Sequence, residues 1–168
     1  MLKNKTINMG VVKKIATALG ELNDEVAYVG GATVSIYADD PTAEDVRPTK
    51  DIDIMLHIVS FSELAALQDE LAQKGIFPDP ESKINCRFKY EDVLIDVMST
   101  KEVGWAPSDP WFEPGFKNLV TFKLDEEITI RIFPVAYFLA TKFSAFHDRG
   151  KDPRTSKDFE DIVYVLDN

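Results

Sequence analysis

The run TKDIDIMLHI, residues 49–58, places two acidic side chains at the head of an alternating apolar stretch. Successive side chains of a β-strand face opposite sides, so Asp51 and Asp53 share one face of the predicted strand and its isoleucines share the other. Two neighbouring carboxylates raise each other's pKa unless a cation lies between them, and hard divalent cations such as Mg²⁺ prefer oxygen ligands. The run therefore predicts a metal site; the alternative is a strand that begins with two solvated aspartates.

A glycine pair lies about twenty positions before this run. Residues 26–29 predict a short strand, Gly30 and Gly31 end it, and residues 32–37 predict a helix. Such a pair lets backbone N–H groups approach a phosphate at the N-terminus of the following helix, although a tight turn is the commoner explanation of two glycines before a helix. An acidic loop over residues 38–48 then leads to the Asp51 strand.

A third acid interrupts a later strand. Alternation over residues 84–90, a turn at Glu91 and Asp92, and the apolar run 93–98 predict a β-hairpin. A charge inside VLIDVM costs several kcal/mol if it is unpaired, so Asp96 needs a partner or a bound ion. We therefore count Asp96 as the third carboxylate. A second hairpin is predicted over residues 119–132.

Apolar side chains at three- and four-residue steps predict four helices. Their stripes are Val12, Ile15, Leu19 and Leu22; Leu64, Leu67 and Leu71; Val135, Phe138, Leu139, Phe143 and Phe146; and Phe159, Ile162, Val163 and Leu166. Ser156 is the expected N-cap of the last helix. Lys142 falls inside the third stripe, so its ammonium extends to solvent, pairs with an acid or faces a cavity that contains an anion.

The composition excludes several classes of site. The chain has 168 residues, 45% of them hydrophobic, which suits one domain with one core. Cys86, the single cysteine, is expected to be a small buried side chain. With only two histidines beside it, the chain lacks the ligands for a structural zinc site and the partners for a Cys–His nucleophile.

The charge balance and the absence of long apolar runs indicate location and partners. The formal net charge is −10, so broad DNA binding is not expected, although Arg149, Lys151, Arg154 and Lys157 form a local basic cluster. No window approaches the ~20 apolar residues of a membrane span, and the first residues do not resemble a signal peptide. We expect a cytoplasmic protein without membrane attachment.

The order of these motifs resembles the polymerase β-like nucleotidyltransferase superfamily. The segments RPTKDIDI, KFSAF and RTSKDFEDI are similar, more narrowly, to the nucleotidyltransferase toxins of abortive-infection and toxin–antitoxin systems (AbiEii-type). The resemblance implies an α+β fold with a mixed, mostly antiparallel central sheet flanked by helices. It also implies a single nucleotidyltransferase-like domain, with a catalytic sheet core over residues 1–133 and a C-terminal helical pair over residues 134–168.

The resemblance also implies a set of site residues. Catalytic roles fall on Asp51, Asp53, Asp96, Lys142 and Asp158, and the Lys-Asp-x-x-Asp segment offers Asp161 as a further candidate. Nucleotide binding falls on Gly30, Gly31, Arg47, Thr49 and Lys142, with Arg154 and Lys157 as further phosphate contacts. The metal ligands are Asp51, Asp53 and Asp96, for two Mg²⁺ ions with Mn²⁺ as the substitute. The separation between Gly31 and Asp51 exceeds the family's usual spacing, as if YADDPTAEDV were inserted.

The implied reaction moves a nucleoside monophosphate from a nucleoside triphosphate such as ATP to an acceptor hydroxyl. Such a transfer depends on positioning and charge neutralisation more than on covalent catalysis. Toxin relatives make tRNA the first acceptor to consider and imply a cognate antitoxin as partner. The alternatives are a small-molecule (antibiotic) nucleotidyltransferase, a non-catalytic binding module or antitoxin partner, and a general α+β interaction domain.

Overall fold

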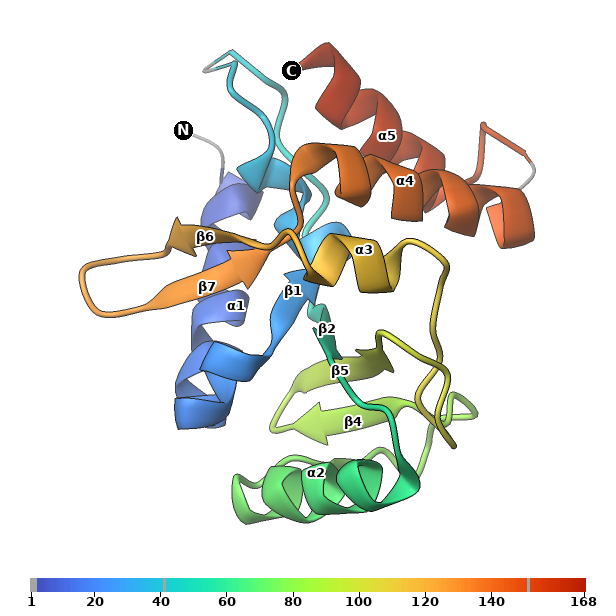
Figure 1. Cartoon of the computed structure of the whole chain (residues 1–168). Helices are drawn as coiled ribbons and strands as arrows, with labels where there is room; N and C mark the ends of the chain where they lie inside the picture. The colour runs from blue at the N-terminus through green and yellow to red at the C-terminus, as the bar shows by residue number, and fades with distance from the viewer. Residues whose placement is uncertain (1–2, 41, 151) are drawn as a thin grey trace.

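The structure is a computed structural model that describes residues 3–40, 42–150 and 152–168 (Figure 1). The elements in chain order are α1 (Lys3–Leu19), η1 (Gly20–Glu25), β1 (Ala27–Val29), η2 (Gly31–Ile36), β2 (Asp51–Leu56), α2 (Phe61–Gln73), β3 (Phe77–Pro78), β4 (Arg87–Tyr90), β5 (Val93–Ser99), α3 (Phe112–Phe116), β6 (Val120–Lys123), β7 (Thr129–Ile132), α4 (Val135–Ala145), η3 (Phe146–Gly150) and α5 (Lys157–Asp167). Lys151 of the predicted basic cluster and Pro41 of the predicted loop lie outside the described residues.

One mixed sheet organises the molecule. Across the described residues its strand order is β3-β4-β5-β2-β1-β7-β6, with β2 at the centre. Only the β1–β7 and β2–β5 pairs are parallel; the other four pairs are antiparallel. The predicted α+β fold with a mostly antiparallel sheet is therefore confirmed, and both predicted hairpins are present.

The two faces of β2 differ as predicted. Ile52, Ile54 and Leu56 are buried in a core shared with the apolar stripes of α1 and α2. On the opposite face Met55 belongs to a second cluster with Phe133, which directly follows β7, and Phe138 of α4, and this face begins with the two acids. The helices α4 and α5 lie side by side over the end of the sheet that carries the acids (Figure 1).

The loop between η2 and β2 is hydrogen-bonded to the first helix and to the last residue of the chain. The Asp45 carboxylate accepts hydrogen bonds from the backbone N–H groups of Asn4 and Lys5 at the start of α1. Backbone N–H groups of Asp39 and Asp40 donate to the carbonyl of Asn168. This segment thereby connects the first helix to the last and delivers the chain to β2.

Some predicted boundaries and faces are wrong. β4 begins at Arg87 rather than at residue 84, because the backbone N–H of Arg87 donates to the carbonyl of Ile84 and closes a turn there. Val135 and Phe143 were expected on the buried side of α4 and are exposed, whereas Phe138 is buried. Cys86 is buried as expected.

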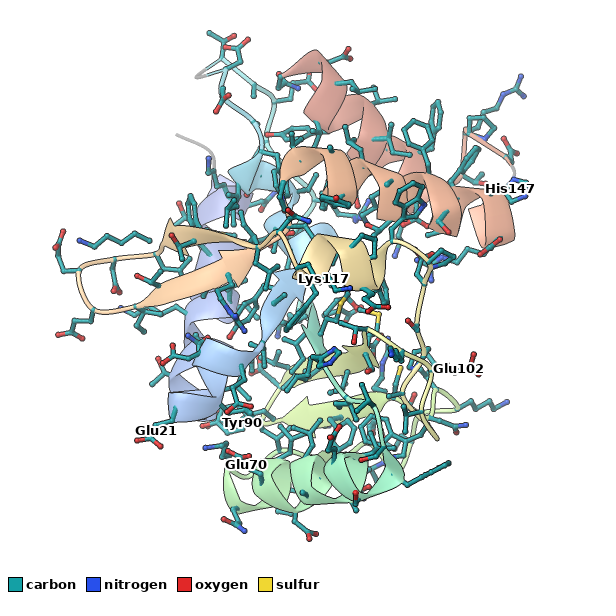
Figure 2. The ribbon with its side chains drawn as sticks, in the orientation of Figure 1. Glu21, Glu70, Tyr90, Glu102, Lys117 and His147 are labelled. Carbon is teal, nitrogen blue, oxygen red and sulfur yellow. The ribbon has the colours of Figure 1, made fainter. Side chains whose placement is uncertain are left out.

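The helix α5 is rotated relative to the predicted stripe. Its buried residues are Asp158, Asp161, Ile162 and Val165, while Val163 and Leu166 face solvent. Ser156 caps the helix as predicted, accepting from the N–H of Phe159. His147 lies near the outer end of the helical segment formed by α4 and η3 (Figure 2). No helix in the described segments combines the length and the apolar character that a membrane crossing needs.

Candidate active site

The glycine pair lies directly against the acidic face of β2. Val29 pairs with Asp53 across the antiparallel β1–β2 ladder, so the turn at Gly30 sits beside that carboxylate. Gly30 has φ +73°, and a Cβ there would overlap the Asp53 carboxyl group. At Gly31 a Cβ would meet only ordinary contacts. Gly30 is therefore required by the position of Asp53, and Gly31 is not.

The Asp53 carboxylate carries no hydrogen bond or ion pair with any described residue. Burial raises the pKa of Asp53 to about 6, and the negative charge of Asp96 adds to this, against the opposing charges of Lys142 and Arg149. Asp51 lies two residues earlier on the same face and is exposed. A partly buried carboxylate with a raised pKa and no direct partner is the environment that a bound cation would stabilise.

Asp96 has a partner that the sequence analysis did not identify. In the parallel β2–β5 ladder Asp96 pairs with Asp53, and in the antiparallel β4–β5 ladder it pairs with Arg87. Arg87 donates from Nε to Asp96 Oδ1 at 2.7 Å and from Nη2 to Oδ2 at 2.8 Å. This bidentate hydrogen bond raises the pKa of Arg87 and explains how a charge is tolerated within β5.

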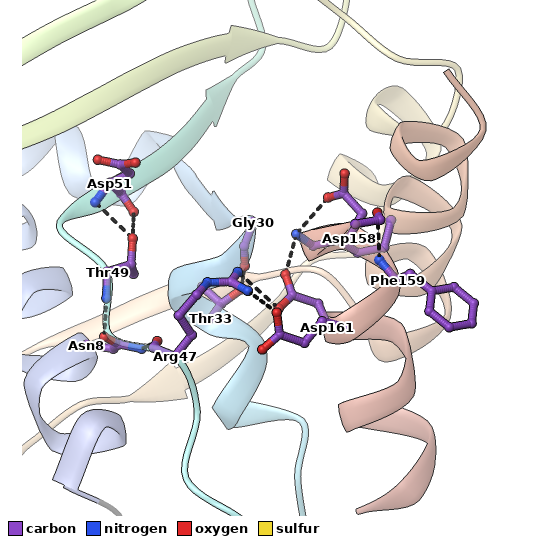
Figure 3. A network of polar contacts seen from close by, with 12 residues as sticks. Asn8, Gly30, Thr33, Arg47, Thr49, Asp51, Asp158, Phe159 and Asp161 are labelled. Carbon is purple, nitrogen blue, oxygen red and sulfur yellow. Dashed lines mark hydrogen bonds and ion pairs between the residues drawn. The ribbon is translucent and has the colours of Figure 1, made fainter. Parts of the chain in front are cut away.

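The helix side of the site is a buried ion-pair cluster. Lys142 of α4 is buried, and its Nζ lies 3.3 Å from Asp158 Oδ1 and 2.7 Å from Asp161 Oδ2, both on α5 (Figure 3). The contact to Asp161 Oδ2 lacks hydrogen-bond geometry, so this oxygen has no hydrogen-bond donor among the described residues. Of the three open expectations for Lys142, extension to solvent is wrong, because the side chain is buried and pairs with acids.

Arg149 completes this cluster from the end of η3. Its guanidinium donates to both carboxylate oxygens of Asp158 at 3.1 and 3.4 Å, although the arginine side chain itself is 74% exposed. Burial acts to raise the pKa of Asp158, but the hydrogen bond from Arg149 and the charge of Lys142 outweigh it, so the pKa is lowered. Asp158 is thereby held as a carboxylate between two cations.

The segment before β2 is held in place by an asparagine of α1. The fully buried Asn8 donates from its amide to the carbonyl of Arg47 and accepts from the backbone N–H of Thr49 (Figure 3). The Thr49 hydroxyl in turn accepts from the N–H of Asp51. Arg47 extends to α5, where it contacts Glu160 at 2.6 Å and Asp161 at 3.5 Å.

A single cleft of about 660 Å³ joins these parts. The sheet contributes Asp51, Asp53, Asp96 and Arg87 to its lining. The helices α4, η3 and α5 contribute Lys142, Arg149, Lys157, Asp158 and Asp161. The start of η2 contributes Gly31, and the loop before β2 contributes Arg47 and Thr49. Of the predicted site residues, Gly30 lies behind Asp53 and Arg154 is absent from this lining. The structure thus brings the other sequence-predicted residues to one cleft, with acids on the sheet and paired charges opposite.

The acids fit a divalent cation only in part. Within the described segments no three His, Cys, Asp or Glu side chains are arranged as a ready metal site. Asp51 and Asp53 share one face, and Asp53 has no direct partner, so these two fit a cation. Both oxygens of Asp96 are bonded to Arg87, so Asp96 does not fit while that pair persists.

Two residues that the sequence analysis left out of the site could have been found from spacing. A two-residue turn at Glu91 and Asp92 pairs Tyr90 with Val93, and the same register pairs Arg87 with Asp96. Arg149 follows Lys142 by seven residues, about two helical turns, which places both on one side of a continuous helix. In both cases the spacing of the residues in the sequence was enough to predict the contact or the shared helix face.

A model of one protein family matches most of the chain. Residues 18–168 match the family model described as "Nucleotidyl transferase AbiEii toxin, Type IV TA system". No curated protein matches the chain.

The solved structures with a similar fold share little sequence with this chain. One is the antibiotic-resistance factor ANT(2'')-Ia, in a solution structure (TM-score 0.61, 15% identity, 97% of this chain and 84% of that chain). Another is the same factor in a crystal structure with adenylyl-2''-tobramycin (0.58, 15%, 95% and 87%). A third is an antigenic nucleotidyltransferase-like protein from Paracoccidioides brasiliensis (0.59, 16%, 96% and 76%). At these identities the likeness concerns the fold alone.

Proposed function

Because the chain belongs to the AbiEii family of nucleotidyl transferase toxins, we propose that its cleft transfers a nucleoside monophosphate from a nucleoside triphosphate to an acceptor hydroxyl. The family and the fold make it a nucleotidyltransferase enzyme. The single observation that carries the proposed site is the Asp53 carboxylate, which has a raised pKa and no hydrogen-bond or ion-pair partner among the described residues, in a cleft that cations of α4 and η3 also line.

Each side of the cleft has a role in this proposal. Asp51 and Asp53 would hold the metal ions, Mg²⁺ or Mn²⁺, with Asp96 as the third ligand once it is released from Arg87. When bound, such ions lower the pKa of the attacking hydroxyl and neutralise the departing pyrophosphate. Gly31 leaves room for the phosphates beside η2, and Thr49 lines the approach to Asp51.

The helix side would supply fixed positive charge to the triphosphate. Lys142 is held by Asp158 and Asp161, so its ammonium needs little reorganisation when a ligand arrives. Arg47 and Lys157 line the same cleft and are the further phosphate contacts. The residues that line the cleft include cations and acids in similar numbers, whereas the whole chain has a net charge of −10. The cleft is therefore less negative than the rest of the protein, and this suits an anionic ligand.

The acceptor is the second part of the proposal. The family description, a toxin of a type IV toxin–antitoxin system, supports a cognate antitoxin as partner. We keep tRNA as the first acceptor to test, as the resemblance to toxin nucleotidyltransferases implies. A small cationic antibiotic is the second candidate, since one structural neighbour was solved with adenylylated tobramycin and the acidic surface of this chain disfavours RNA by long-range charge.

Transfer of label tests the proposal. Protein is incubated with α-³²P-labelled nucleoside triphosphates and Mg²⁺, with total RNA in one arm and an aminoglycoside panel in the other. We expect label on one acceptor class, and a loss of about 100-fold or more in the Asp51→Ala, Asp53→Ala double variant.

A matched control removes two exposed acids outside the cleft, Asp39→Ala with Asp69→Ala, and should retain the activity. Full activity in the Asp51→Ala, Asp53→Ala variant, or no transfer to any acceptor with any triphosphate, would refute the enzymatic proposal.

A further inference from the structure

The Arg87–Asp96 pair is built into the sheet. The two residues lie directly opposite each other in the β4–β5 ladder, and their side chains are 20% and 19% exposed. The bidentate geometry uses both oxygens of Asp96 and the Nε and one Nη of Arg87. The remaining N–H groups of Arg87 make no hydrogen bond to another residue of the described part of the chain, and the residue lines the cleft.

The three acids that the sheet contributes to the cleft therefore differ in whether a cation is bonded to them. Asp96 is bonded to a guanidinium, whereas its neighbour Asp53, one strand away, is bonded to none. The Arg87 cation also lies near enough to Asp51 and Asp53 for their charges to raise its pKa. One fixed cation thus occupies the place beside Asp96 where a metal ion would have to lie to use that carboxylate.

We propose that Arg87 competes with the metal for Asp96 and thereby couples metal binding to nucleotide binding. This inference rests on the proposed function and concerns the order of events at the same cleft. Without nucleotide, Asp96 keeps Arg87 and the metal has only Asp51 and Asp53. When a triphosphate enters, its oxygens accept the guanidinium in place of Asp96, and Asp96 becomes free to complete the metal site.

This exchange keeps every charge paired. The guanidinium passes from a carboxylate to a phosphate, both of which can accept two parallel N–H bonds on two anionic oxygens, and the carboxylate passes from the guanidinium to the metal. Nucleotide alone would take Arg87 and leave the Asp96 carboxylate without a cation. Metal alone would take Asp96 and leave the Arg87 guanidinium without an anion. Metal and nucleotide should therefore bind cooperatively, with each strengthening the other by the same factor.

Binding of Mn²⁺, followed by the electron paramagnetic resonance of the free ion, tests this without any measurement of activity. In the absence of nucleotide we expect Arg87→Met to bind Mn²⁺ about tenfold more tightly than wild type, because Asp96 is then free. In an Asp96→Asn background the same substitution should change Mn²⁺ affinity less than threefold. With a nucleoside triphosphate analogue present, the difference between wild type and Arg87→Met should shrink.

A matched control separates this exchange from general electrostatics. Arg149→Met also removes a cation whose charge reaches Asp53, but that arginine bonds to Asp158 and not to Asp96. It should change Mn²⁺ affinity much less than Arg87→Met. If Arg87→Met does not fold, Arg87→Lys keeps the charge but loses the bidentate bond, and it should bind Mn²⁺ at least threefold more tightly than wild type.

The outcomes distinguish the two proposals. One outcome refutes only the role of Arg87: Asp53→Asn loses the Mn²⁺ binding of wild type, but Arg87→Met binds Mn²⁺ no more tightly than wild type. If Arg87→Met does not fold, the same conclusion is drawn from Arg87→Lys. An equal gain in Arg149→Met refutes it as well. Mn²⁺ binding that is absent in every form, or unchanged in Asp53→Asn, refutes the metal site and with it the exchange at Asp96.

Discussion

At the scale of single residues, Gly30 is the position where backbone conformation and the site depend on each other. Its φ of +73° is unfavourable for other residues, and a Cβ would overlap the carboxyl group of Asp53. We expect Gly30→Ala to lower the free energy of unfolding by about 1–3 kcal/mol, measured by urea denaturation. Gly31→Ala is the control and should change stability by less than about 1 kcal/mol; equal losses in the two variants would contradict the assignment.

The raised pKa of Asp53 predicts a specific pH dependence of stability. The ordinary value is 3.8 and the folded value is about 6, so between these pH values the unfolded chain loses a proton that the folded chain keeps. The contribution of Asp53 is therefore neutral below about pH 4, becomes increasingly destabilising as the pH rises to 6, and stays constant above.

Urea denaturation of metal-free protein, in the presence of a chelator, measures this contribution. Asp53→Asn should match wild type at acid pH and exceed its free energy of unfolding by about 2–3 kcal/mol at pH 7. The exposed Asp69→Asn is the control and should follow wild type throughout. An Asp53→Asn variant whose difference from wild type does not grow with pH would exclude the raised pKa.

At the scale of elements, α5 shows why hydrophobic periodicity alone chose the wrong face. The apolar pattern favoured burial of Val163 and Leu166, but both are exposed, and Asp158 and Asp161 face inward instead. Lys142 of α4 and Arg149 of η3 pair with carboxylates of α5. These pairs form only when the face of α5 that carries Asp158 and Asp161 is turned inward. No periodicity within α5 encodes that requirement; its signs in the sequence were Lys142 in the stripe of α4 and the family resemblance of RTSKDFEDI, which placed Asp158 and Asp161 in the site.

The Lys142 cluster therefore makes a prediction about the packing of α4 on α5. Lys142→Met leaves two buried carboxylates with one cation fewer, and we expect a loss of about 3 kcal/mol or more in the free energy of unfolding by urea. Lys117→Met removes a lysine that is 68% exposed and pairs with Glu113 on the surface. This control should cost less than about 1 kcal/mol, and a similar cost for both lysines would show that the buried cluster does not hold the helices together.

The β4–β5 hairpin shows the opposite case, in which the sequence contained more than was taken from it. The turn at Glu91 and Asp92 fixes the register, and the register alone identifies Arg87 as the neighbour of Asp96. The requirement that Asp96 have a partner or an ion was stated from the sequence. The partner is an arginine on the adjacent strand.

At the scale of the whole molecule, the sheet topology is what places distant residues together. The alternation of residues 51–58 and the order of the motifs were enough to predict the acidic face of β2 and the α+β class. These patterns were not enough to predict that the segment before β2 is hydrogen-bonded to Asn8 of α1 and that Arg47 contacts Asp161 of α5. Each of these contacts joins residues about 40 or more positions apart in the chain. Contacts of that kind follow from packing of the complete chain rather than from any local pattern.

Calorimetric titration with a non-hydrolysable nucleoside triphosphate, with and without Mg²⁺, tests most directly whether one cleft binds metal and triphosphate together. The account predicts that removing Mg²⁺ with a chelator weakens binding by about tenfold or more, and that Asp53→Asn removes this dependence on Mg²⁺. Triphosphate binding that is equally tight with and without Mg²⁺, and unchanged in Asp53→Asn, would contradict it.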